Sequence, residues 1–134
     1  MKIFMILIAA LFPFLHNTPY EVQISDCQKD QIIAESQGSK LNLSLFNIHL
    51  KNENAWKKTC SILMEADHVT MEIDPTTQIN EKLSVYLFAD GTLIQEELLS
   101  QGLAYILIRN PEYVYEEQME KAETQTRSEE RRVG

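Results

Sequence analysis

Apolar and polar residues alternate along residues 21–50 with the two-residue period of β-strands. A Gln-Gly-Ser turn at residues 37–39 divides the second stretch from the third. The alternation changes phase between Leu45 and Phe46. A β-bulge at that point explains such a shift and lets a sheet curl toward a barrel. The pattern therefore predicts three strands joined by short connections.

The next part of the chain changes from a helical to a strand period. Residues 54–66 place Trp56 and Leu63 on one face, which predicts a helix with Trp56 in the core. Residues 69–73 and 83–88 follow as fourth and fifth strands. The fifth ends in an Ala-Asp-Gly turn, where the glycine permits a positive φ.

The last third of the chain predicts two further helices. Residues 92–95, Thr-Leu-Ile-Gln, fit a capping box, and Gly102 is placed to end the helix that follows. A third helix begins near Tyr113 and runs past Met119. The order of three strands, helix, two strands, helix and helix predicts an α+β fold, an OB-fold with a five-stranded β-barrel and three helices.

An almost unbroken apolar run occupies residues 3–15, after the single cation Lys2. It is shorter than the roughly 17 residues that a membrane-spanning helix needs, and it suits a secretory signal peptide. The His-Asn-Thr that follows is a poor cleavage site. Residues 1–19 are thus a signal peptide or, as an alternative, an uncleaved anchor; a buried first strand ranks below both. We expect a secreted or membrane-associated protein, with any membrane association through residues 3–15.

The charge of the chain counts against nucleic acid as a partner. The formal net charge is -8, and Arg109 is the one arginine before the last eight residues. Proteins that bind nucleic acid neutralise phosphates with lysine and arginine. The glutamates between residues 112 and 123 fit a solvated helix face rather than a metal site, and they are Glu112, Glu116, Glu117, Glu120 and Glu123.

The two cysteines, Cys27 and Cys60, leave two alternatives open. Export permits them to form a disulfide, and each also suits a small buried apolar site. They form no CxxC motif, and the three histidines have no metal-ligand spacing with them.

The stretch from residue 83 to residue 105, LSVYLFADGTLIQEELLSQGLAY, resembles the staphylococcal nuclease (thermonuclease) family. That family has a strand ending in an Asp-Gly turn, then a helix, then Gln-Gly-Leu-Ala. The loop at residues 110–111 and the helix at residues 117–123 are similar to the family's last helix, so the resemblance covers about residues 20–126. It implies a five-stranded OB-type barrel and, in active members, calcium-dependent cleavage of DNA and RNA.

The resemblance also implies where catalytic residues would stand, and most are replaced. Active members carry an arginine in the third strand, followed by a hydrophobic stretch and Asp-Thr-Pro-Glu. The matching segment puts Ser44 at the arginine, His49 at the metal-binding aspartate, Leu50 at the threonine and Asn52 at the general-base glutamate. Asparagine is no base near neutral pH, and calcium prefers oxygen to the nitrogen of histidine.

Two of the implied positions keep part of their chemistry. Asp30 matches the first metal-binding aspartate, and Lys82 stands for the second arginine with its charge but without the planar fork. We therefore expect no efficient nuclease activity and no assigned cofactor, with calcium only if the family site persists. The preferred hypothesis is an exported or tethered binding or structural module. A divergent metal-dependent nuclease using Asp30, His49 and Lys82 is the alternative, and a non-catalytic OB-fold for single-stranded nucleic acid or a small ligand is the third hypothesis.

The last eight residues, RSEERRVG at positions 127–134, are what a common short-read sequencing adapter encodes when translated in frame. This indicates read-through at the end of a contig. The rival interpretation is a native, charged continuation of the third helix, which its composition also suits.

Sequencing the genomic locus across codons 126 and 127 tests this interpretation. We expect the native reading frame to diverge from RSEERRVG after Thr126. A genomic sequence that encodes the same eight residues would defeat the adapter interpretation and make the tail native.

Overall fold

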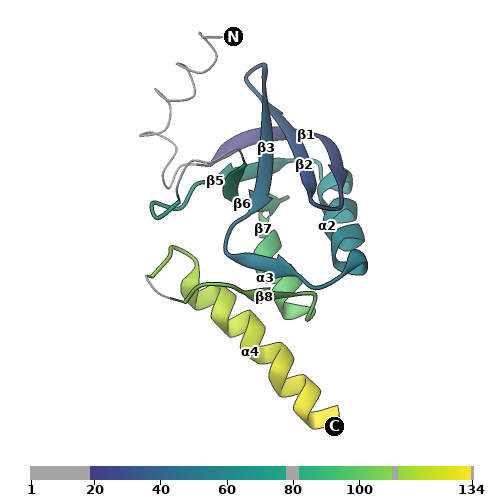
Figure 1. Ribbon diagram of the computed structural model, residues 1–134, viewed down its shortest axis with the longest axis vertical. Coiled ribbons are helices and arrows are strands. Elements are labelled where there is room, and N and C mark those ends of the chain that lie inside the picture. The colour runs from purple at the N-terminus through teal and green to yellow at the C-terminus, as the bar shows by residue number, and fades with distance from the viewer. Residues whose placement is uncertain (1–18, 78–81, 110–111, 134) are drawn as a thin grey trace.

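The computed structural model describes residues 19–77, 82–109 and 112–133, with side chains as far as Thr126 (Figure 1). The elements run along the chain in the order β1 (Tyr20–Gln28), β2 (Gln31–Ser36), β3 (Ser39–Leu45), β4 (Ile48–Leu50), α2 (Glu53–Glu65), β5 (Val69–Glu72), β6 (Leu83–Ala89), β7 (Thr92–Leu93), α3 (Ile94–Ser100), β8 (Ala104–Ile106) and α4 (Glu116–Val133). The expected signal or anchor segment lies outside the described residues, apart from Pro19. The backbone of residues 127–133 belongs to α4.

Five strands close into a mixed barrel. Neighbouring strands follow the order β3-β2-β1-β5-β6, and β3 returns to pair with β6 in parallel. That closing pair sets Leu43 opposite Leu83, Ser44 opposite Ser84 and Leu45 opposite Val85. The α+β class and the OB-fold arrangement with three helices are confirmed. Figure 1 shows α2 beside the barrel and α4 at the end away from the β2–β3 hairpin.

Two tight turns shape the sheet as their residue types predict. Gln37 and Gly38 join β2 to β3 with φ of 52° and 80°, and Asp90 and Gly91 join β6 to β7 with φ of 50° and 86°. Positive φ at both central residues is the geometry of a type I′ hairpin, whose twist matches that of the strands. Gly102, with φ of 72°, follows the end of α3 as expected.

The bulge expected between Leu45 and Phe46 is wrong. The strand β3 ends at Leu45, and Asn47, with φ of 59°, turns the chain out of the barrel. The strand β4 then pairs with β8 in a separate two-stranded sheet. The Asn47 amide holds the turn, because its Nδ2 donates to the Ile108 carbonyl and its Oδ1 accepts from the Ile108 N–H, both at 2.7 Å. The register shift of the barrel lies in β1, between Ile24 and Asp26.

The capping box expected at residues 92–95 is also wrong. Leu93 is the N-cap of α3 and makes no side-chain cap bond, while the Gln95 side chain is fully buried. Its Nε2 donates to the Val85 carbonyl at 2.9 Å and to the Phe46 carbonyl at 3.4 Å, and its Oε1 accepts from Leu87 N at 3.4 Å. Buried backbone groups need hydrogen-bond partners. At the Leu45–Val85 pair, where β3 leaves the barrel, the Gln95 amide is such a partner.

The expectation of a fully solvated glutamate face is wrong at Glu123. This carboxylate is 6% exposed and accepts from the Ile106 N–H at 2.9 Å and from Arg109 Nη2 at 2.6 Å. Donation to Glu123 raises the pKa of the Arg109 guanidinium. A buried carboxylate needs such partners, so Glu123 fastens α4 to β8.

Asp74 joins three separate parts of the fold. Its buried carboxylate accepts from the Thr76 hydroxyl at 2.6 Å, the Thr76 N–H at 2.9 Å, the Tyr86 hydroxyl at 2.6 Å and the Val114 N–H at 2.8 Å. Burial by itself would raise the pKa of Asp74, but these hydrogen bonds outweigh it and the pKa lies below 3.8. Since Val114 is held to the barrel, α4 begins at Glu116 rather than near Tyr113.

Cys27 and Cys60 form a disulfide that joins β1 to α2, with their Cα atoms 5.4 Å apart. Of the two alternatives left open by the sequence, a disulfide or two free buried thiols, the structure has the disulfide. None of the described helices is both long enough and apolar enough to cross a membrane.

Replacement of Asp74 tests the three-way junction. We expect Asp74→Asn to lower the free energy of unfolding by about 2 to 3 kcal/mol at pH 7, because the amide cannot accept every bond that the carboxylate accepts. The Asp74 carboxyl has a lower pKa in the folded protein than in the unfolded chain, so it stabilises the fold at a pH above its unfolded-state pKa. This stabilisation is lost as the pH falls through the folded-state pKa. The difference in free energy of unfolding between wild type and variant, measured in urea, should therefore become smaller below about pH 4. A gap of equal size at pH 7 and at about pH 3 would contradict this account.

The disulfide provides a second stability test. Its two cysteines are 33 positions apart in sequence. Closing a loop of that size lowers the conformational entropy of the unfolded chain, which stabilises the folded state by about 3 to 4 kcal/mol. The double variant Cys27→Ala/Cys60→Ala should lose that much free energy of unfolding in urea. Wild type measured in a reducing buffer is the control and should lose a similar amount; an unchanged unfolding midpoint in both would refute the estimate.

Candidate functional site

A small cleft opens at the edge of the barrel where β3 leaves it. Its volume is about 140 Å³, and we call it the barrel-edge cleft. Its lining comes from strands β3 and β4, helix α2, the β1–β2 turn and the residue before β6. The lining residues are Asp30, Leu43, Ser44, Leu45, Ile48, His49, Leu50, Trp56 and Lys82. Four of the five site residues proposed from the sequence, Asp30, Ser44, His49 and Lys82, therefore share one cleft.

Asp30 and Lys82 meet through the backbone rather than through an ion pair. Asp30 occupies the β1–β2 turn with φ of 61°, a conformation that aspartate tolerates better than most residues. The Lys82 ammonium donates to the Asp30 carbonyl oxygen at 2.8 Å. Both side chains are exposed, so their charges are screened by water. The lysine fixes the turn and leaves the aspartate carboxylate facing solvent.

Ser44 and His49 are held by neighbours that the barrel closure supplies. The Ser44 and Ser84 hydroxyls are 2.9 Å apart in a hydrogen bond across the β3–β6 pair. His49 lies opposite Tyr105 in the β4–β8 pair, and the two rings meet edge to face with centroids 5.2 Å apart. His49 is exposed, so it is not the partly buried polar group that the sequence also allowed.

Asn52 has a different role from the one its alignment suggests. It is the N-cap of α2, and its Oδ1 accepts from the Ala55 N–H at 3.0 Å. An asparagine cap satisfies one of the free N–H groups of the first helical turn. This side chain is used in holding the helix, and it does not line the cleft. Asparagine before the helical pattern was a signal for this cap in the sequence.

Trp56 was expected in the core, and the structure corrects this in part. The side chain packs against the core but is only half-buried, and it lines the cleft. Its place on the first turn of α2 brings the indole to the cleft beside the aliphatic residues of β3 and β4. Its helical spacing alone could not separate a core position from a cleft wall.

The cleft does not fit the calcium chemistry of active nucleases. Calcium takes six to eight oxygen ligands, and among the described residues that line the cleft there is one carboxylate, that of Asp30. Across the described residues, no three acidic, histidine or cysteine side chains are grouped to hold a metal. No arginine lines the cleft, and its single cation, Lys82, has one proton donated to a carbonyl.

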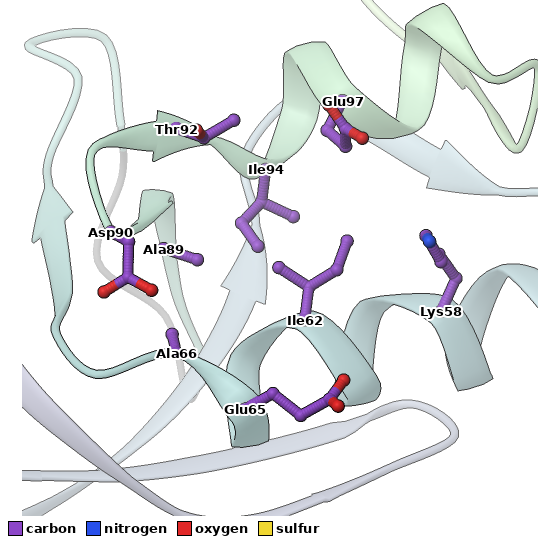
Figure 2. A pocket seen from close by; sticks show the side chains of 9 residues that line it. All are labelled: Lys58, Ile62, Glu65, Ala66, Ala89, Asp90, Thr92, Ile94 and Glu97. Carbon is purple, nitrogen blue, oxygen red and sulfur yellow. The ribbon is translucent and has the colours of Figure 1, made fainter.

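A second hollow lies between α2 and α3, and its volume is about 280 Å³ (Figure 2). Ile62 and Ile94 point toward each other across it. Its acidic side chains already serve the local structure. The Asp90 carboxylate accepts from the N–H groups of Asp67 and His68, at 3.2 and 2.9 Å. Glu97 likewise accepts from the side chain of Gln101 on its own helix. Its polar groups therefore support no chemistry that we can assign.

The chain matches no protein-family model and no curated protein.

Proposed function

We propose that this protein is an exported or membrane-tethered member of the staphylococcal nuclease-like class that binds a ligand without efficient hydrolysis of phosphodiesters. The observation that carries the proposal is the convergence of Asp30, Ser44, His49 and Lys82 on one cleft. The four positions span 52 residues of sequence, from Asp30 to Lys82, and the resemblance alone points to them. Their meeting at one place supports the relationship, and their chemistry argues against the family's reaction.

Three groups that the resemblance implies for phosphodiester hydrolysis are replaced in this chain. A hard cation needs several oxygen ligands, and one carboxylate is present. The transition state needs paired arginine forks, and Lys82 offers a single ammonium. The position at which the resemblance implies a general-base glutamate holds Asn52, an amide engaged as a helix cap. Binding without turnover is the function that this set of residues supports best.

The proposed location outside the cytoplasm has its own support. The Cys27–Cys60 disulfide is of the kind that forms and persists in oxidising compartments. The apolar run at residues 3–15 suits export or tethering. The net charge of -8 makes a polyanion such as nucleic acid a poor partner, so we favour a small or weakly charged ligand.

A divergent metal-dependent nuclease is the alternative function. The observation in its favour is that Asp30 and Lys82, the two positions that keep their charge, lie in the same cleft as His49. Such an enzyme would use Asp30 and His49 around a metal that tolerates nitrogen, with Lys82 beside the phosphate.

Cleavage of single-stranded DNA and of RNA by the purified protein separates these functions. We expect no metal-dependent turnover with calcium, with manganese or with chelator, in a sample whose circular dichroism shows that it is folded. The variant Asp30→Asn keeps a residue that tolerates positive φ and should change nothing. Asp26→Asn, an exposed acid on the same hairpin but outside the cleft, is the matched control.

Metal-dependent turnover lost in Asp30→Asn and kept in Asp26→Asn would overturn the proposal and establish the divergent nuclease. Turnover that survives both substitutions would place the activity outside the barrel-edge cleft, and the cleft would then not be its active site.

A further inference from the structure

The disulfide joins the two elements that carry charged and aromatic residues of the barrel-edge cleft. Asp30 lies three residues after Cys27, in the turn that ends β1. Trp56 lies four residues before Cys60, which places both on one face of α2 a single turn apart. The covalent link therefore holds the helix that carries Trp56 against the hairpin that carries Asp30.

The N-terminal half of α2 packs on the barrel through small buried residues and through the half-buried Trp56. The residues it buries there, Ala55 and Thr59, are small, and the Thr59 hydroxyl donates to the Ala55 carbonyl of its own helix. Leu63, the large buried aliphatic residue, belongs to the C-terminal half. Burial of apolar area scales with side-chain size, so the fully buried packing of α2 is greatest in its C-terminal half, and the large apolar contact of the N-terminal half comes from the half-buried Trp56.

The ionic link in the same region is weak. Lys29 and Glu53 approach to 4.0 Å with side chains that are 63% and 74% exposed. Exposed pairs of this kind contribute little. Among the described residues, the disulfide is thus the strong tie between the first turns of α2 and the β1–β2 hairpin.

We propose that the Cys27–Cys60 disulfide is a redox-sensitive clamp that fixes the Trp56 wall of the barrel-edge cleft, and that a dithiol reductant releases it. The two cysteines are half-buried rather than fully enclosed, and a small dithiol is the reductant that we expect to reach them. This inference rests on the proposed function, since it treats the cleft as the binding site and supplies its regulation.

The chemistry of the release is ordinary thiol–disulfide exchange. One thiolate of the dithiol attacks a cysteine sulfur, the S–S bond breaks, and a mixed disulfide forms. The second thiolate of the reductant attacks that mixed disulfide and frees the remaining cysteine. Two electrons pass from the dithiol, which becomes a disulfide, and the two cysteine thiolates take up protons from water.

Trp56 is the one tryptophan of the chain, so its fluorescence reports the cleft wall directly. The experiment compares the full chain before and after treatment with dithiothreitol, by quenching with acrylamide and by the wavelength of the emission maximum. We expect reduction to raise the quenching constant and shift the maximum to the red, while far-ultraviolet circular dichroism stays that of the folded barrel. Emission intensity is not the readout, because a nearby disulfide itself quenches tryptophan.

The double variant Cys27→Ala/Cys60→Ala is the matched control. It should show the quenching constant of the reduced protein from the start and should not respond to dithiothreitol. If that variant fails to fold, hydrogen exchange of the wild-type chain serves instead. Reduction should then speed exchange in the first turns of α2 and leave β5 and β6 protected.

Two results would overturn the clamp. An equal quenching constant of Trp56 in the oxidised and reduced states would show that the disulfide does not control the exposure of the cleft wall. Loss of the folded circular dichroism on reduction would make it a global stability element. The readout needs no ligand and no turnover, so its failure leaves the proposed function standing, and nuclease activity in the cleavage assay leaves the Trp56 result unaffected.

Discussion

The parallel pairing of β3 with β6 is the constraint on which the rest of the structure depends. It closes the barrel and ends at the Leu45–Val85 pair, after which the Phe46 N–H donates to the Val85 carbonyl at 2.9 Å. The buried Gln95 amide satisfies the carbonyls of Phe46 and Val85, so α3 is fixed at the place where β3 leaves the barrel. Leaving such groups unpaired in the interior would cost free energy comparable to lost hydrogen bonds. The same closure sets Ser44 beside Ser84 and brings the cleft together.

Buried carboxylates attach the C-terminal part of the chain to this barrel. Asp74 receives the Val114 N–H and the Tyr86 hydroxyl, and Glu123 receives the Ile106 N–H and Arg109. Both are hydrogen-bonded through donors that come from more than one element, which is the condition under which a buried charge is tolerated. Helix α4 is therefore positioned by polar contacts as well as by the packing of buried residues such as Met119.

The barrel-edge cleft follows from these attachments. It gathers Asp30, Ser44, His49 and Lys82, and its lining among the described residues holds a single carboxylate and no arginine. The cleft brings Trp56 from one element together with Asp30 and Lys82 from others. Its geometry depends on the one covalent link between α2 and the β1–β2 hairpin that the described residues show.

The sequence by itself determined the five barrel strands and the approximate positions of the three helices. Strand alternation, the Gln37-Gly38 and Asp90-Gly91 turns and the stop at Gly102 are local features, because backbone period and positive φ depend on adjacent residues. The scarcity of arginine was visible in the same way. Only the tertiary structure decided that the phase shift after Leu45 is an exit from the barrel, that Gln95 and Glu123 are buried, that Trp56 lines a cleft and that the cysteines pair. Each of these depends on a partner distant in sequence, such as Cys60 for Cys27, which is 33 residues away, and no local pattern records such a partner.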